Sequence, residues 1–410
     1  MSPLSSPRRI ALVSAFPPGT QTLNEYGLHL AKAFAARPDV AEVVIIADRL
    51  PTPLPELDLG PKLRVRRVWD FNSPLAGARI VAALRRERVD GAVFNLQMAS
   101  FGNSEVPAAL GLLAPLAARL AGIPSGVIAH NLISGVDLEQ TQLKGQVLRQ
   151  KLVRLGGAVI TRALLAANYL TVTLESYRAD LKARYPGAPV ILVPHGTFDT
   201  ECRALVPSHL RPNRIVTMGK FGTYKRLETL IAAVRHLRDQ PGFADLELVI
   251  GGTDHPNTPG YLASVAERCA GEAGLHFHGY VAEDDIPTFF AEARASVFDY
   301  STTTGSSGVL HQTACYGAVP VFPRIGDFVD VCRDEGIDGA TYAPGDVLGM
   351  ADAIASVLAD PGCADRLAEA NRAAALGMPI SAVAEVHMTL LAQRPKSRPL
   401  PAPVSAKAAA

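Results

Sequence analysis

An unusual density of small hydroxyl residues and glycines marks the segment 299–322. Between Ser301 and Gly308 the chain carries six serines or threonines and two glycines, directly before the helix-like stretch VLHQTACY. The first N–H groups of a helix are unpaired, and together with the helix dipole they attract anions. Serine and threonine are also ordinary helix caps, but capping needs fewer of them. We therefore predict a phosphate site within 304–317, a segment that includes Ser306, Ser307, Gly308 and Val309.

Two lysines follow the strand-like segment RIVTMG (214–219). Lys220 and Lys225 lie in a loop beside Gly219 and Gly222, and a helix-like stretch begins immediately afterwards. Two cations five residues apart suit a diphosphate, and glycines allow the backbone to approach it. Exposed loop lysines are usually only solvated charges. This loop, however, is expected at the carboxyl edge of a sheet, where α/β proteins bind ligands.

The first half of the chain offers two further candidates at a carboxyl edge. A Pro/Gly loop after the strand 8–16 contains Gly19 and Thr20, although an ordinary turn explains it about as well, and it is no G-x-G-x-x-G dinucleotide motif. His130 ends the apolar strand SGVIAHN, where it can accept a hydrogen bond from a ligand hydroxyl or position a second substrate. His195 ends ILVPHG, and we expect a structural role for it.

Composition excludes several classes of function. The 410 residues are 48% hydrophobic and carry a net charge of +1, which favours a packed globular protein and gives no basic surplus for nucleic acid. The five cysteines are scattered and odd in number, so we expect neither a disulfide framework nor a metal site, and a reducing, cytoplasmic compartment. MSPLSSPRRI lacks the apolar core of a signal peptide. The most apolar stretch, 106–123, contains Pro115 and Arg119 and falls short of a membrane span.

Alternation of strand-like and helix-like segments predicts an α/β protein with two Rossmann-like domains. The expected strands are 8–16, 41–47, 63–69, 91–97, 125–131, 169–175 and 189–194, then 214–219, 246–252, 275–280, 295–301 and 318–323. The expected helices include 23–36, 107–121, 226–237, 259–273 and 348–359. We place an N-terminal domain at 8–196, a linker at 197–213 and a C-terminal domain at 214–380. A helix at 381–393 returns to the first domain, and 1–7 and 394–410 are expected to be disordered.

The segment 144–165 combines basic and apolar residues with helical character. A basic amphipathic helix can lie on an anionic membrane surface. More often such a helix packs on its own domain, and the sequence leaves both possibilities open.

Taken in order, several segments resemble the family-4-like retaining glycosyltransferases of the GT-B fold. These segments are FPPGTQTLNEYGLHLAKAF, GKFGTYKRLETLIAAV, LHFHGYVAEDDIPTFFAEARASVFDYS and SSGVLHQTACYGAVPV, and the resemblance runs over about 9–392. It implies two Rossmann-like domains facing each other across a cleft and transfer of a hexose from a UDP- or GDP-linked sugar to a saccharide or lipid-linked acceptor, with retention. It implies no cofactor and no metal ion.

The resemblance also assigns roles to individual residues. Lys220 and Lys225 would contact the donor diphosphate, with Gly19 near the phosphates. His130 would touch the donor sugar, and Tyr280 and Val281 would lie beside the nucleobase. The two glutamates of the family's E-x7-E motif fall on Thr304 and Gln312, and this departure leaves a weak or inactive sugar-nucleotide-binding partner protein as an alternative. A GT-B sugar-nucleotide epimerase is a further alternative, but it would need carboxylates in the cleft, so the loss of these glutamates does not favour it.

Overall fold

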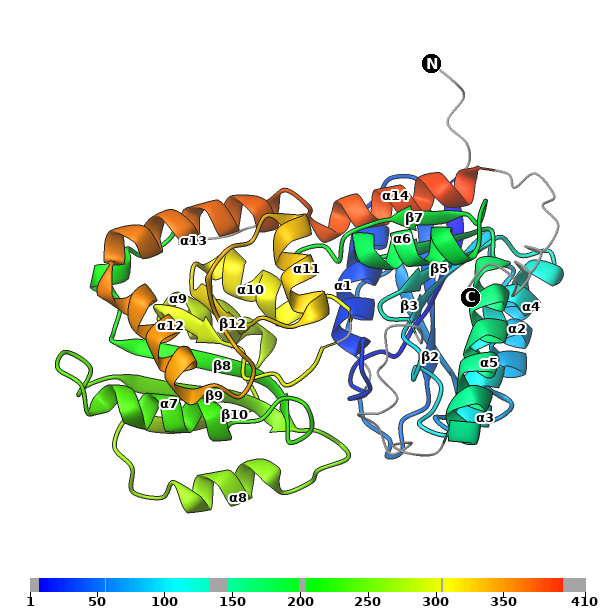
Figure 1. Ribbon diagram of the computed structural model, residues 1–410. Helices are drawn as coiled ribbons and strands as arrows, with labels where there is room; N and C mark the ends of the chain where they lie inside the picture. Colours follow the sequence, from blue (N-terminus) through cyan, green and yellow to red (C-terminus); the bar gives the residue numbers. More distant parts are fainter. Residues whose placement is uncertain (1–6, 56, 133–146, 199–203, 304, 394–410) are drawn as a thin grey trace. The chain divides into compact units, whose positions relative to one another are not determined.

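The computed structural model describes residues 7–55, 57–132, 147–198, 204–303 and 305–393, with the backbone alone between 147 and 154. The chain forms two compact units, which are described separately. Unit 1 comprises Met1–His195 together with Ile380–Ala410, and unit 2 comprises Gly196–Pro379. Figure 1 shows that each unit is a twisted sheet covered by helices.

Unit 1 is built on a seven-stranded parallel sheet in the order β3-β2-β1-β4-β5-β6-β7. Every residue of β4 and β5 is buried, as expected of strands with helices on both faces. The strands are β1 (Arg8–Val13), β2 (Val40–Asp48), β3 (Leu63–Trp69), β4 (Gly91–Leu96), β5 (Ser125–Ala129), β6 (Tyr169–Val172) and β7 (Val190–Leu192).

A helix or a pair of helices separates most consecutive strands of unit 1, but β3 follows β2 directly, and the last helix follows unit 2 in the chain. They are α1 (Asn24–Ala35), α2 (Ala76–Glu87), α3 (Glu105–Leu112), α4 (Ala114–Leu120), α5 (Val147–Leu165), α6 (Glu175–Arg184) and α14 (Ile380–Ala392). Although α14 is the final element of the chain, it packs against α1 and β5. The Tyr169 hydroxyl lies 3.0 Å from Nδ1 of His387, which anchors α14 in the core of unit 1.

Unit 2 contains a six-stranded parallel sheet in the order β10-β9-β8-β11-β12-β13, which is the Rossmann arrangement. Its strands are β8 (Arg214–Phe221), β9 (Glu247–Asp254), β10 (Leu275–Gly279), β11 (Ala295–Val297), β12 (Val319–Pro323) and β13 (Ala340–Tyr342). Its helices are α7 (Glu228–Arg238), α8 (Tyr261–Arg268), α9 (Ile286–Ala291), α10 (Gly308–Tyr316), α11 (Gly326–Glu335), α12 (Val347–Ala359) and α13 (Pro361–Leu376), with short 3-10 turns at Ser208–Leu210 and Glu283–Asp285. The Rossmann-like α/β architecture predicted from the sequence is thus confirmed.

Two local predictions differ from the structure. The helix expected at 107–121 is two helices, α3 and α4, because Pro115 lacks a backbone N–H and suits only the first turn of a new helix. Strand β13 was not predicted, because three residues are too short to show a period. Among the described residues, no single helix is long and apolar enough to cross a membrane; only α12 and α13 taken together reach that length and composition, and they meet at 95°.

The cysteines require a correction. Cys269, Cys332 and Cys363 are free, as expected, but Cys315 in α10 is disulfide-bonded. An odd and scattered set of cysteines argues against a disulfide framework, yet it cannot exclude one bridge between residues that the fold brings together. The cysteine pattern therefore no longer supports the expected reducing compartment.

Candidate functional site

The predicted phosphate-binding segments meet at the point where the strand order of unit 2 reverses. β8 and β11 are neighbours, but the chain leaves them in opposite directions, and ligands of open α/β sheets bind at such a point. The two loops that follow these strands are joined by main-chain contacts. Lys225 and Tyr300 form an antiparallel bridge, and Ser301 N donates to Tyr224 O over 2.9 Å.

Lys225 is held in a defined position within this pair of loops. Its ammonium nitrogen lies 4.5 Å from the ring centroid of Tyr300, within range of a cation–π contact. Its aliphatic part passes Gly219, where an added Cβ would lie 3.3 Å from Cδ. The buried hydroxyl of Tyr300 lies beside Ser307, in a contact that does not reach hydrogen-bond geometry. Lys225 and the start of α10 therefore share one neighbour, Tyr300.

Lys220 belongs to the same positively charged region. His255 follows β9, and its pKa is lowered. The largest cause is burial, followed by the charge of Lys220 and then by that of Lys225. Both lysines are half-buried, so their charges are less screened by water than those of surface lysines. The sequence placed Lys220 and Lys225 in one loop, but β8 continues to Phe221, so Gly219 and Lys220 pair with β9 and only Lys225 lies in the loop that follows. Gly219 and Lys225 are nevertheless in contact.

The start of α10 has the features of an anion site. Ser307 is the N-cap, and its Oγ accepts from Leu310 N over 3.4 Å. Within the part of the chain that the structure describes, the N–H groups of Gly308 and Val309 have no acceptor. Both residues are half-buried, and a helix of nine residues follows them. Free donors at a helix start can hold a phosphate oxygen.

Helix α11 supports this loop with two carboxylates that the sequence did not reveal. Asp327 Oδ2 accepts from Gly305 N over 2.7 Å. Glu335 Oε2 lies 2.6 Å from Nε2 of His311, whose Nδ1 lies 2.8 Å from the carbonyl oxygen of Ser307. Because a carbonyl and a carboxylate only accept, both ring nitrogens of His311 donate. Burial alone would lower the pKa of His311, but Glu335 and the Ser307 carbonyl raise it.

The remaining residues predicted in unit 2 differ in accessibility. Tyr280 follows β10 and its surface is 66% exposed, so its ring is open to a ligand. Val281 is only 6% exposed and packs in the core, where a Cβ on Gly251 would approach it to 2.6 Å. Gln312 is half-buried on α10. Thr304 lies outside the described residues. The described residues contain no group of three or more His, Cys, Asp or Glu side chains that could hold a metal ion.

A close contact between two glycines gives a testable prediction about the lysine loop. Gly252 has φ +137°, and a Cβ there would lie 1.9 Å from the carbonyl oxygen of Gly219. We expect Gly252→Ala to lower the free energy of unfolding by about 3 kcal/mol. An alanine is strained at this φ, and its Cβ would overlap with the carbonyl oxygen of Gly219. Urea denaturation measures the change. Gly326→Ala, at a position with open space around it, is the control and should change the stability little.

In unit 1, β1 and β4 form the corresponding reversal of strand order. The loop after β1 is a tight turn in which Gly19 N donates to Phe16 O over 3.1 Å. Of the two residues predicted here, Gly19 is buried with its N–H engaged, and Thr20 is exposed. Arg67 Nη2 donates to Pro17 O over 2.7 Å and holds the loop from the side of β3.

His130 lies directly after β5 and is nearly buried. Its Nε2 lies 2.7 Å from Oδ1 of Asn95, and its ring packs against the rings of Tyr26 and His195, with centroids 4.5 and 5.8 Å away. The Tyr26 hydroxyl donates to the carbonyl oxygen of His195 over 3.0 Å. Burial, followed by the charge of His387, lowers the pKa of His130 to about 3. At neutral pH His130 is uncharged.

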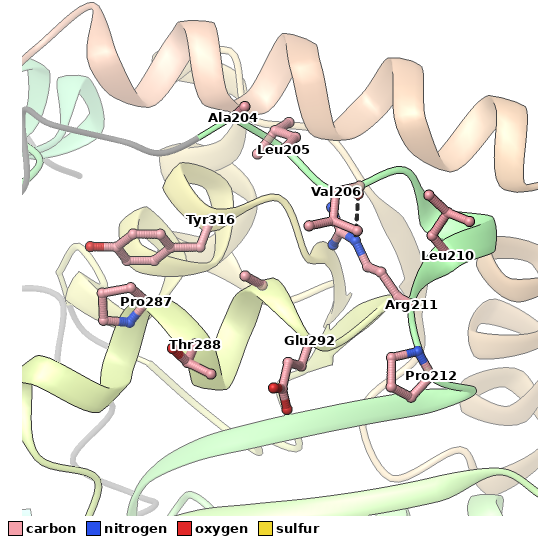
Figure 2. A pocket seen from close by; sticks show the side chains of 11 residues that line it. Ala204, Leu205, Val206, Leu210, Arg211, Pro212, Pro287, Thr288, Glu292 and Tyr316 are labelled. Atoms are coloured by element: carbon pink, nitrogen blue, oxygen red, sulfur yellow. Dashed lines mark hydrogen bonds between the residues drawn. The ribbon is translucent and has the colours of Figure 1, made fainter.

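An apolar hollow of about 220 Å³ lies elsewhere in unit 2, between the segment 204–212 and α9 (Figure 2). Arg211 reaches across its floor and donates to Val206 O over 2.8 Å. Tyr316 at the end of α10 lines the hollow, but none of the predicted site residues does. The hollow is therefore separate from the candidate phosphate site.

Comparison with solved structures shows that the chain has the GT-B fold. Sucrose-phosphate synthase from Thermosynechococcus elongatus matches with a TM-score of 0.72 and 19% identity over 94% of this chain and 98% of that one. Anabaena HepE in complex with UDP-glucose matches with a TM-score of 0.65 and 17% identity, over 94% of this chain and 100% of that one. WaaG, a glycosyltransferase involved in lipopolysaccharide biosynthesis, matches with a TM-score of 0.67 and 15% identity, over 94% of this chain and 100% of that one.

The family model described as glycosyl transferases group 1 matches residues 212–360, a range within unit 2 that includes both lysines and the start of α10. This match agrees with the predicted resemblance over that part of the chain. No curated protein sequence matches the chain significantly.

Proposed function

We propose that the protein transfers a hexose from a nucleotide diphosphate sugar, UDP- or GDP-linked, to a saccharide or lipid-linked acceptor, with retention and without a metal ion. The observation that carries the proposal is the meeting of Lys225 and the α10 start around Tyr300. A cation and free helix N–H groups can together stabilise a leaving diphosphate. The solved structures of HepE with UDP and with UDP-glucose support a donor of this class.

A thermal-shift screen tests the proposal directly. A ligand that binds only the native state raises the melting temperature, by RT ln(1 + [L]/Kd) in free energy. We expect one of UDP, GDP or ADP and its sugar to raise the Tm at millimolar concentration, without added metal and in the presence of EDTA. Uridine or guanosine, which lack the phosphates, should give a much smaller shift. The absence of any shift with all the nucleotides would contradict the proposal.

A second function, a sugar-nucleotide-binding partner without transferase activity, is favoured by one observation. Gln312 replaces the second glutamate that the family resemblance implies, and the first falls on Thr304. A neutral amide can still hydrogen-bond a ribose, but it cannot act as a carboxylate. Release of UDP from UDP-glucose, measured with a coupled assay and a mixture of acceptors, separates the two functions: the partner protein would bind the donor and release nothing.

We also propose that α5, within the segment 144–165, contacts an anionic membrane where a lipid-linked acceptor would lie. Leu155 and Val159 on this helix are exposed, and so is Val106 on the neighbouring α3. The sequence adds Lys151 and Arg154 to the same helix. A helix that combines basic residues in its sequence with exposed apolar side chains is typical of helices that lie on a membrane surface.

Liposome co-sedimentation tests this contact. We expect binding to vesicles that contain anionic phosphatidylglycerol and little binding to phosphatidylcholine alone. Leu155→Glu/Val159→Glu should bind about tenfold more weakly, because two exposed apolar side chains that would enter the membrane are replaced by negative charges. Leu348→Glu, an exposed leucine of unit 2, is the matched control. Equal binding by the double variant and the wild type would rule out α5 as the contact.

A further inference from the structure

A buried histidine in the first turn of α10 is held at both of its ring nitrogens. His311 is 4% exposed, and its Nδ1 lies 2.8 Å from the carbonyl oxygen of Ser307. Its Nε2 lies 2.6 Å from Oε2 of Glu335 on α11, which lies beside α10 in unit 2 (Figure 1). A neutral imidazole carries only one N–H, whereas a carbonyl and a carboxylate only accept. The geometry therefore requires an imidazolium beside an ionised Glu335.

The carbonyl that His311 binds belongs to the peptide group of the candidate anion site. Ser307 O and the N–H of Gly308 are opposite ends of one planar trans peptide group, so fixing the oxygen fixes the direction of the N–H. Ser307 O also accepts from Leu310 N over 3.1 Å and from His311 N over 3.4 Å, and the contact with Nδ1 is the shortest of the three. The buried hydroxyl of Tyr300, which has no partner among the described residues, lies beside Ser307 as a further donor.

The proton on His311 also sets the charge behind this site. While the proton is present, the charges of His311 and Glu335 cancel. A charged donor on Ser307 O polarises the peptide group, which strengthens the N–H of Gly308 as a donor. Loss of the proton would leave a buried negative charge next to the site and would remove one of the two hydrogen bonds of the ring. Each of these changes weakens the binding of an anion.

Few other titratable groups act on this pair. The helix α9 and the strand β12, which also pack against α10, contain no titratable side chain, and on α13 the charged residues that are half-buried are Asp365 and Arg372. Burial and then the charge of Glu335 raise the pKa of the Cys332 thiol on α11, which therefore stays neutral. Glu335 is the carboxylate in direct contact with His311.

We propose that His311 and Glu335 are positioning residues that hold the peptide group between Ser307 and Gly308 in the direction an anion requires, and that the proton of this pair controls the affinity for the nucleotide diphosphate sugar. The ligand class follows from the charge: a diphosphate is bound when the pair is neutral and repelled when it is negative. The inference rests on the proposed function, but the protonation of His311 can be measured in the free protein.

The sign of the pH dependence follows from the surroundings of His311. Burial alone would lower its pKa, but the charge and hydrogen bond of Glu335, together with the Ser307 carbonyl, raise it above 6.5. The affinity should therefore be highest below pH 6.5 and fall as the pH rises through the pKa of His311. Removing the charge of Glu335 leaves burial as the main cause, so the pKa should then lie below 6.5.

The first experiment is long-range ¹H–¹⁵N NMR of the full chain with ¹⁵N-labelled histidine, in which His311→Gln assigns the signal. We expect both ring nitrogens of His311 to be protonated at pH 6, with a titration midpoint above 6.5. In Glu335→Gln the midpoint should fall below 6.5. A wild-type midpoint below 6.5, or the same midpoint in both proteins, would overturn the pair whether or not the protein is active.

The second experiment measures the Kd of UDP-glucose by calorimetry between pH 5.5 and 9. A sugar diphosphate is a suitable probe because it lacks the terminal phosphate group that titrates near pH 6. We expect the wild-type Kd to rise about tenfold across the midpoint found by NMR, the loss of about one charge-assisted hydrogen bond. Glu335→Gln should show this rise below pH 6.5 and bind about tenfold more weakly at pH 7. Glu267→Gln, an exposed glutamate of α8, is the matched control and should behave as the wild type.

The outcomes separate the inference from the proposed function. If the Kd stays constant while NMR shows that His311 loses its proton, the positioning role is wrong. If the wild type binds no nucleotide sugar, the proposed function is wrong. Sulfate, whose charge is constant over this range, then tests the site through the amide signal of Gly308, and a response that ignores the protonation of His311 would overturn the inference. If Glu335→Gln fails to fold, the wild-type midpoints from NMR and calorimetry must still coincide.

Discussion

Lys225→Met should lower kcat/KM for sugar transfer by about 10²- to 10³-fold, the usual effect of removing one preorganised group that stabilises charge in a transition state. The ammonium group is held 4.5 Å from the Tyr300 ring, beside the start of α10, so its charge needs no rearrangement when the diphosphate leaves. Methionine keeps the aliphatic contact with Gly219 and removes only the charge. Steady-state kinetics with the donor found by the thermal-shift screen measure the effect.

Two variants complete this test. Lys225→Arg keeps the cation but changes its shape, and should retain part of the activity. Lys182→Met removes an exposed lysine of α6 and should retain all of it. If Lys225→Met turned over at the wild-type rate with an unchanged Tm, Lys225 would not be the group that stabilises the leaving diphosphate.

The second large effect is the acid sensitivity of unit 1. Burial lowers the pKa values of His130 and His387 to about 3 from 6.5, with the charge of His387 as a further cause for His130. In the unfolded chain both histidines take up protons near pH 6.5, whereas in the folded protein they do not. The stability that they contribute is therefore complete above pH 6.5 and is lost as the pH falls toward 3. At pH 4 the loss is about 3 kcal/mol for each histidine.

His387→Gln should remove one of these two contributions. Glutamine can still hydrogen-bond the Tyr169 hydroxyl but does not titrate. Urea denaturation between pH 4 and 7.5 should show that the free energy of unfolding falls less steeply with falling pH in the variant than in the wild type. The two slopes should differ by about 1.4 kcal/mol per pH unit, because one proton fewer is taken up on unfolding. His209→Gln, an exposed histidine of unit 2, should leave the slope unchanged. If the free energy of unfolding had the same pH dependence in His387→Gln and the wild type, the buried neutral state of His387 would be wrong.

Strand identity was accessible from the sequence because parallel strands with helices on both faces are nearly continuous apolar runs. All twelve expected strands are present, whereas the short edge strand β13 carries no such signal. The phosphate segment around Ser307 was accessible for a similar reason: its glycines and hydroxyl residues are adjacent in the chain.

Contacts between distant residues could not be predicted in this way. The contact of Glu335 with His311 and that of Asp327 with Gly305 join residues 24 and 22 positions apart, without any local pattern in the sequence. Likewise, nothing in the sequence reveals that Asn95 faces His130, since each looks like an ordinary residue of a strand end. Val281 was predicted to lie beside a nucleobase because of its place in a motif, but its side chain is buried in the core. A motif position does not reveal burial.

The position of α14 has a consequence for synthesis on the ribosome. Unit 2 is one continuous stretch of chain, so it can complete its fold while translation is still in progress. Unit 1 begins first but lacks the helix that carries His387 until residues 380–392 have been synthesised, after all of unit 2. Until then the faces of α1 and β5 that α14 covers, together with the Tyr169 hydroxyl, are open to water or to a chaperone. A premature stop codon before residue 380 would therefore damage the half of the protein that was made first.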